Sequence, residues 1–191
     1  MKSLAMIKQI KTKQESKKFI SDMNLNCFPD LFVDISETEK IRKFMNTNKA
    51  PLYIIRDGVR AQSPFHFFST FEECLGYLNN YQDIVIIAVS VNAYKNHKVI
   101  LGTIELTSDN WVSLTASTSP ECDHRSIFEV NDFNVHCSIL EKSLRNIPEF
   151  DTIYTFLVEH SLIDVIVEYT IYDIPVGHKN EKLVIQEIRH Y

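Results

Sequence analysis

Glycine is scarce in this chain, which has only 4 glycines among 191 residues. Phosphate cradles of the P-loop and dinucleotide-binding types need glycines at fixed spacing, because the backbone must approach the phosphates closely. Neither Gly-x-x-x-x-Gly-Lys-Ser/Thr nor Gly-x-Gly-x-x-Gly occurs in the sequence. A nucleotide site built on either motif is therefore not expected.

Cysteine pairs with metal-site spacing are also absent. The four cysteines lie far apart, at Cys27, Cys74, Cys122 and Cys137. None forms a Cys-x-x-Cys pair, and free thiols in a reducing compartment are the expected state. The spacing of Cys122, His124, His136 and Cys137 does not suit one tetrahedral ion, so we predict no metal site.

Long apolar runs and a basic excess are missing too. No run approaches the roughly 18 apolar residues that a membrane span needs, and the first residues lack the apolar stretch of a signal peptide. The formal net charge is −5, although the first eighteen residues hold six lysines. A weakly acidic chain lacks the basic face that duplex nucleic acid requires. We expect a cytoplasmic protein that binds neither membranes nor duplex nucleic acid.

The segments that are present predict an α+β fold. Six runs rich in β-branched residues predict strands at 52–57, 83–91, 98–108, 110–116, 162–175 and 180–190. The short run CFPDLFVDI, at 27–35, predicts a further extended segment. Helical patterns lie between them, and two Ser-x-x-Glu capping boxes, at Ser36 and Ser69, predict helix starts. We expect a single globular domain over 1–191, with a lysine-rich helix at about 4–23. Its core would be a mainly antiparallel sheet of about six strands with helices packed on one side.

The strongest candidate site lies around Arg56, at the end of the apolar run LYIIRD. The planar guanidinium group of an arginine can bind two oxygens of a phosphate or carboxylate at once. Arg60 adds a second cation, and the predicted helix start at Ser69 and Thr70 favours an anion near its amides. These four residues predict a site for an anionic small ligand, with a nucleotide as one possibility. A structural ion pair between Arg56 and Glu168 or Glu187 is the alternative.

Two further features predict a protein-interaction surface. Phe65 and Phe67 follow the arginines, and aromatic residues and arginine dominate interface hot spots. Residues 117–136 form the longest polar, irregular stretch, and a loop of that length inside a compact domain is often functional or mobile. An interaction or inhibitor protein is therefore a second hypothesis.

The terminal strands carry two candidate catalytic carboxylates, Glu168 and Glu187. If the last two strands pair symmetrically about Gly177, Glu168 lies opposite Gln186, one step from Glu187. Paired carboxylates at a sheet centre can do acid–base chemistry or hold a divalent cation. The alternative is that they are surface charges paired with a lysine or arginine.

Two family resemblances concern the same residues. The strand Tyr53-Ile-Ile-Arg56, a polar loop and the Ser69-Thr70 helix start resemble the first nucleotide-contacting strand of phosphoenolpyruvate-synthase-type ATP-grasp enzymes, over about twenty residues. The acidic and serine-rich part of that motif is missing. Arg56, Ser117 to Ser119 and a late glutamate resemble the Arg, Ser-Thr-Ser and Glu pattern of ADP-ribosyltransferases. Here the serines precede a proline in a loop, and no Glu-x-Glu or Gln-x-Glu follows.

Three functional classes follow from these features. They are a binding protein for an anionic small molecule, a protein-interaction or inhibitor protein, and a transferase that uses NAD or ATP. In the third class Arg56 would contact phosphate, and Glu168 or Glu187 would act as the acid–base residue. The sequence identifies no cofactor, no protein partner and no oligomeric state.

Overall fold

The computed structural model describes residues 10, 12–58, 64–123 and 126–190. Its class is α+β with antiparallel sheets, as predicted. The strands form two sheets, of four and five strands, where the sequence had predicted one sheet of about six. Internal contacts divide the chain into two compact units, Phe28–Lys95 and Met1–Cys27 with Asn96–Tyr191. The single domain expected over 1–191 stays a prediction.

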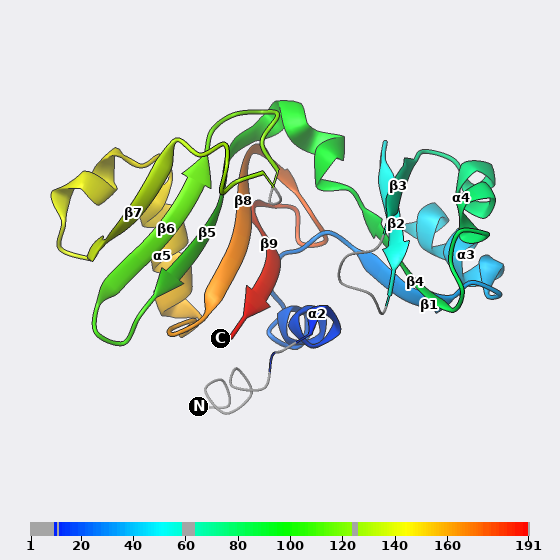
Figure 1. The fold of residues 1–191 in the computed structure, drawn as a ribbon, viewed down its shortest axis with the longest axis horizontal. Helices are drawn as coiled ribbons and strands as arrows, with labels where there is room; N and C mark the ends of the chain where they lie inside the picture. The colour runs from blue at the N-terminus through cyan, green and yellow to red at the C-terminus, as the bar shows by residue number, and fades with distance from the viewer. Residues whose placement is uncertain (1–9, 11, 59–63, 124–125, 191) are drawn as a thin grey trace. The chain divides into compact units, whose positions relative to one another are not determined.

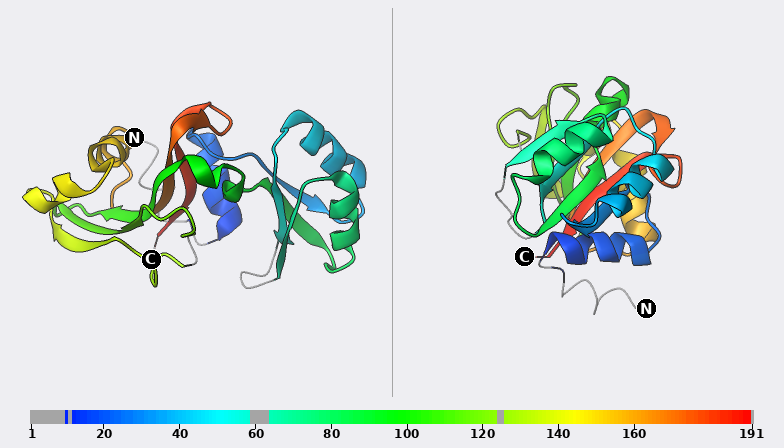
Figure 2. Two further views of the ribbon diagram at one scale, coloured as in Figure 1. Left: turned by 90° about the horizontal axis from the view of Figure 1, so that it is seen from above. Right: turned by 90° about the vertical axis from the view of Figure 1, so that its right-hand side faces the viewer.

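The unit Phe28–Lys95 contains the four-stranded sheet (Figure 1). Its strands are β1 (Asp30–Asp34), β2 (Tyr53–Asp57), β3 (Phe65–Phe68) and β4 (Ile84–Val89), in the order β1-β4-β2-β3. Helices α3 (Thr38–Thr47) and α4 (Phe71–Leu78) cover one face of this sheet (Figure 2). The 3-10 helix η1 (Val91–His97) follows β4.

Strand register divides this sheet into two faces, because side chains alternate along a strand. Tyr53 is paired with Phe68, and both are buried. With Ile55 they lie on the face that α3 and α4 cover. Arg56 lies three residues after Tyr53, and its partner Phe65 lies three residues before Phe68. Because side chains alternate, both point to the opposite, helix-free face, which α3 and α4 do not cover.

The other unit contains the five-stranded sheet. Its strands are β5 (Lys98–Leu106), β6 (Trp111–Ser117), β7 (Phe133–Ser138), β8 (Ile166–Val176) and β9 (Glu181–Arg189), in the order β7-β6-β5-β8-β9. The same unit contains helix α2 (Lys13–Asp22), the 3-10 helix η2 (Lys142–Asn146) and helix α5 (Phe150–Glu159). All neighbouring strands are antiparallel.

The core of this unit lies between the sheet and α5. Ile104, Leu114 and Val167 cluster with Ile153 and Leu157 of α5. Helix α2 lies along β9, where the hydroxyl of Ser16 accepts a hydrogen bond of 2.8 Å from the backbone of Ile188. One face of the sheet is thus apolar and covered by α5, while the other carries polar residues such as Thr103 and Glu168.

Several predicted boundaries differ from the observed ones. The predicted loop 117–136 includes the first residues of β7, because Phe133 and Asn134 pair with β6. Of the predicted helix at about 4–23, the structure describes α2, which begins after Thr12 with a capping box to Glu15. Ser36 does not cap α3, because its hydroxyl and amide both bond the carboxylate of Asp34.

Candidate functional site

Arg56 lies on the helix-free face of the four-stranded sheet. Its cross-strand partners are Phe65 on β3 and Ile86 on β4. Neighbouring positions on this face are filled by Ile54 and Phe67, which also pair with each other. The half-buried arginine therefore lies among apolar and aromatic side chains, on a face that neither of the described helices α3 and α4 covers.

The two predicted interaction residues, Phe65 and Phe67, are neighbours on this same face. Their rings meet edge to face, with centroids 5.3 Å apart and an interplanar angle of 80°. Phe67 is 39% exposed. Between them, His66 points to the opposite face and stacks on Tyr77 of α4 at 4.4 Å. Arg56 and these two phenylalanines thus form one candidate surface on the four-stranded sheet.

Ser69 and Thr70 are not beside Arg56. Strand β3 runs antiparallel to β2, so the two residues after Phe68 lie past Tyr53, at the other end of the hairpin from Arg56. Thr70, rather than Ser69, is the N-cap of α4. The carboxylate of Glu73 accepts hydrogen bonds from the amides of both Ser69 and Thr70, at 2.7 and 3.2 Å. Arg60, the fourth predicted ligand residue, lies outside the described residues.

Ser69 and Thr70 instead line a shallow hollow of about 390 Å³ beside α3. Arg42 and Lys49 also line it. The guanidinium of Arg42 lies 4.1 Å from the ring centre of Phe71. This hollow is separate from the Arg56 face, because it opens on the side of the sheet that carries the helices.

Glu168 and Glu187 lie directly opposite each other on β8 and β9. The prediction that Glu168 faces Gln186 is wrong, because a bulge changes the register. Tyr169 pairs with Ile185, so Gln186 is the extra residue on β9. The buried Nε2 of Gln186 has no hydrogen-bond partner among the described residues.

Two cations lie against these carboxylates. Arg189 contacts Glu168 through its terminal nitrogen and Glu187 through Nε, the latter at 3.4 Å. Lys13 of α2 lies 3.2 Å from Glu187. Both glutamate side chains are largely buried, at 14% and 13% exposed. The two glutamates, Arg189 and Lys13 therefore form one compact cluster of two acidic and two basic side chains.

The pKa of Glu168 is raised above its ordinary value. Burial of the carboxyl group is the largest cause, and the negative charge of Glu187 adds to it. Arg189 and Lys13 act in the opposite direction without cancelling these effects. A carboxyl group with a raised pKa holds its proton more readily, which is a property of acid–base residues.

The cluster does not form a metal site by itself. Among the described residues, no group of three or more histidines, cysteines, aspartates or glutamates is placed to hold a metal ion. Glu168 and Glu187 could contribute two carboxylates to a cation whose remaining ligands come from water or a bound phosphate.

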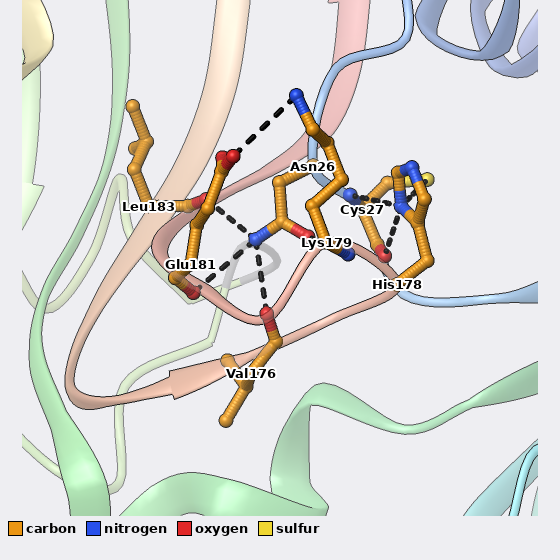
Figure 3. Close-up of polar contacts among 7 residues, drawn as sticks. All are labelled: Asn26, Cys27, Val176, His178, Lys179, Glu181 and Leu183. Atoms are coloured by element: carbon orange, nitrogen blue, oxygen red, sulfur yellow. Dashed lines mark hydrogen bonds and ion pairs between the residues drawn. The ribbon is translucent and has the colours of Figure 1, made fainter.

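A buried asparagine fixes the turn that joins β8 to β9 (Figure 3). The amide nitrogen of Asn26 donates to the carbonyl oxygens of Val176, Glu181 and Leu183 at 3.0, 3.2 and 2.8 Å. Its side-chain oxygen accepts from the backbone nitrogen of Lys179 at 3.0 Å. This segment before β1 therefore anchors the hairpin that carries both glutamates.

Cys27 contacts the same turn. The backbone nitrogen of Cys27 donates to Nδ1 of His178 at 3.1 Å, and the sulfur of Cys27 lies 3.7 Å from that nitrogen (Figure 3). Nδ1 of His178 also lies 3.2 Å from the backbone oxygen of Cys27. The ring is thereby engaged with the backbone, which indicates a structural role for the pair.

Two residues of β5 that no sequence motif marked, Thr103 and Glu105, extend the polar face. Thr103 pairs with Glu168, and Glu105 lies two residues further along β5, on the same face. The alternation in KVILGTIELTS was sufficient to place Thr103 and Glu105 together. The pairing of β5 with β8, which places Glu168 beside Thr103, is a long-range contact that alternation alone does not predict.

The segment after β6 packs against one end of the polar face. Cys122 and Ile127 cluster with Leu101 of β5. The carboxylate of Asp132 accepts hydrogen bonds from the amide and hydroxyl of Thr118, at 2.6 and 2.7 Å, and these bonds lower its pKa. Phe128 and Val130 nevertheless stay exposed, at 69% and 50%. Hydrogen bonds and packing thus fix part of the segment, while Phe128 and Val130 remain exposed to solvent.

Comparison with known proteins gives a likeness of fold. No family model and no curated protein matches the sequence. D-alanyl-alanine synthetase A from Vibrio cholerae is 10% identical at a TM-score of 0.52, covering 93% of this chain and 54% of that chain. The ADP complex of N5-carboxyaminoimidazole ribonucleotide synthetase is 9% identical at a TM-score of 0.52, covering 95% and 45%.

A third solved structure is N5-carboxyaminoimidazole synthase from Aspergillus clavatus, in complex with ADP and 5-aminoimidazole ribonucleotide. It is 10% identical at a TM-score of 0.54, covering 96% of this chain and 45% of that chain. The chain therefore spans about half the length of the structures it matches. Among the described residues, no helix is long and apolar enough to cross a membrane. At this level of identity the comparisons establish the fold of the chain.

Proposed function

We propose that this chain binds an anionic nucleotide and that Arg56 contacts its phosphates. The observation that carries the proposal is the position of Arg56, beside Phe65 and Phe67 on the helix-free face of the four-stranded sheet. A guanidinium group suits phosphate oxygens, and an aromatic ring suits the face of a base. One surface thus offers contacts for both parts of a nucleotide.

The fold supports the same proposal. Two of the similar structures have ADP in their complexes, and these neighbours are ATP-grasp ligases. The strand that carries Arg56, with the polar loop after it, resembles the first nucleotide-contacting strand of phosphoenolpyruvate-synthase-type ATP-grasp enzymes. The proposal needs no glycine-rich cradle, because the phosphate contact comes from a side chain.

A panel of nucleotides tests the proposal by thermal unfolding. ADP or ATP is expected to raise the melting temperature, because a ligand that binds only the folded state stabilises it. Arg56→Ala is expected to abolish the shift. Arg42→Ala is the matched control, since it removes the same charge from the helix α3 on the other face of the sheet. An equal shift in wild type and Arg56→Ala would refute the role of Arg56.

A nucleotide-using transferase is the second candidate. The specific observation in its favour is the opposed pair Glu168 and Glu187, with the raised pKa of Glu168. In this proposal Glu168 acts as the acid–base residue, and Glu187 shares a cation with the phosphates. Turnover of ATP or NAD that is unchanged in both Glu168→Gln and Glu187→Gln would remove these roles.

The protein-interaction hypothesis for Phe65, Phe67 and segment 117–136 stays a prediction. Phe67, Phe128 and Val130 are exposed and available for a partner. Replacing Phe65 and Phe67 with serine would abolish a co-purifying partner under this hypothesis. Retained binding in that variant would exclude these two residues as the contact.

A further inference from the structure

A cluster of four side chains lies on the polar face of the five-stranded sheet, apart from the glutamate pair. Glu105 of β5 is opposite Ser113 of β6, and Ser113 is opposite His136 of β7. Trp111 lies two residues before Ser113 and therefore on the same face. Directly opposed residues of antiparallel strands have Cβ atoms about 5 Å apart, and diagonal neighbours are within reach of long or aromatic side chains.

The aromatic part of the cluster is held in a defined orientation. Oγ of Ser113 and Nδ1 of His136 are joined by a hydrogen bond of 2.7 Å. The imidazole stacks on the indole of Trp111, with ring centroids 5.2 Å apart and an interplanar angle of 28°. Trp111 remains 44% exposed. The stack thus occupies part of the indole and leaves part of it open to solvent.

The acidic part of the cluster is Glu105 of β5. Glu105 is half-buried on the central strand of the sheet and has neither a hydrogen-bond nor an ion-pair partner among the described residues. Partial burial of an ionised carboxylate is costly unless a cation or a donor compensates it. Glu168 and Glu187, by contrast, have Arg189 and Lys13.

We propose that Glu105, Trp111, Ser113 and His136 form a binding site for an organic cation, a primary amine or a guanidinium group. The carboxylate supplies a charge-assisted hydrogen bond, and the indole attracts the cation through the negative potential of its ring face. Ser113 is the cross-strand partner of Glu105 and lies two residues from Trp111 on β6. A metal ion fits less well, because Glu105 is the only carboxylate in the cluster.

The cluster of Glu105, Trp111, Ser113 and His136 lies next to the row of residues that contains Glu168. The row Glu105–Ser113–His136 is adjacent to the row that begins at Glu168 and continues through Thr103. A cation bound here would lie on the same sheet face as the charged pair. Cation binding at these four residues does not depend on nucleotide binding at Arg56.

Trp111 is the only tryptophan of the chain, so its fluorescence reports on this site directly. Agmatine, which carries both an amine and a guanidinium group, is the probe, titrated without nucleotide at constant ionic strength. A saturable change in emission is expected. Glu105→Gln is expected to weaken binding about tenfold, because a charge-assisted hydrogen bond is lost.

Glu159→Gln is the matched control, since Glu159 is exposed on α5, which covers the other face. It is expected to bind agmatine as the wild type does. If Glu105→Gln does not fold, Ser113→Ala tests the same site and is also expected to weaken binding. The proposal is overturned if emission does not saturate, if sodium chloride alone reproduces the change, or if the folded Glu105→Gln or Ser113→Ala variant binds agmatine with unchanged affinity.

Discussion

Arg189 bridges Glu168 and Glu187, which face each other across β8 and β9. Like charges directly opposite each other on a sheet repel and destabilise it. Cations beside the two glutamates offset this repulsion. Arg189 and Lys13 supply those cations from β9 and α2. The cluster ties the last strand to the helix along its edge.

The raised pKa of Glu168 predicts a pH dependence of stability. Its ordinary value is 4.5, and the folded value is higher. Above pH 4.5 the unfolded chain loses this proton before the folded chain does, so the free energy of unfolding falls as the pH rises through the interval between the two values. The contribution of Glu168 is therefore largest at or below pH 4.5.

Urea unfolding at a series of pH values measures this effect. The free energy of unfolding of wild type, relative to that of Glu168→Gln, is expected to decrease from pH 4 upward until Glu168 is ionised in both states. Glu159→Gln provides the comparison for an exposed glutamate. A relative stability that rises with pH would show that the cations, and not burial, dominate at Glu168.

Asn26→Ala is expected to destabilise the protein by about 2 to 3 kcal/mol, because it leaves buried backbone groups of the β8–β9 turn without a partner. Asn26 is 2% exposed. Asn146→Ala, at an exposed position, should change stability by less than about 0.5 kcal/mol. Denaturant unfolding of both variants checks the prediction, and equal stabilities would contradict it.

Gly177 and Gly76 are expected to respond oppositely to alanine. Gly177 has φ +80°, and an added Cβ would lie 2.4 Å from Oδ1 of Asn26, so Gly177→Ala should cost more than about 1 kcal/mol. Gly76 lies in α4 with nothing within 4 Å of an added Cβ, so Gly76→Ala should stabilise by about 0.5 to 1 kcal/mol. Thermal unfolding distinguishes them, and a shift of the same sign in both variants would contradict the assignment.

Thr70→Ala is expected to cost about 1 kcal/mol, since Thr70 is the N-cap of α4. Its hydroxyl accepts a hydrogen bond from the amide of Glu73 at 3.2 Å. Ser69→Ala should change stability by less than about 0.5 kcal/mol, because the bond to Ser69 comes from its backbone. A larger loss in Ser69→Ala than in Thr70→Ala, measured by denaturant unfolding, would reverse the assignment.

Local patterns predicted much of the fold. An apolar run identified the strand that carries Arg56. Alternation identified the two terminal strands, and the turn between them placed Glu168 and Glu187 on adjacent strands. The cap of α4 was predicted one residue early because Ser69 and Glu72 have the same spacing as Thr70 and Glu73. Local sequence does not distinguish these two registers.

The features that local patterns did not predict depend on long-range strand pairing. The bulge at Gln186 shifts β9 by one residue, which no period-2 pattern reveals. Strands β4 and β5 follow each other in the chain but belong to different sheets. The antiparallel return of β3 separates Thr70 from Arg56, although the two are only fourteen residues apart in sequence.

A crystal structure grown with ADP is the most direct test of nucleotide binding at Arg56. We expect electron density for the nucleotide with its phosphate oxygens within hydrogen-bond distance of the guanidinium group of Arg56. Density for ADP elsewhere, with Arg56 making no contact to it, would exclude Arg56 as the phosphate ligand.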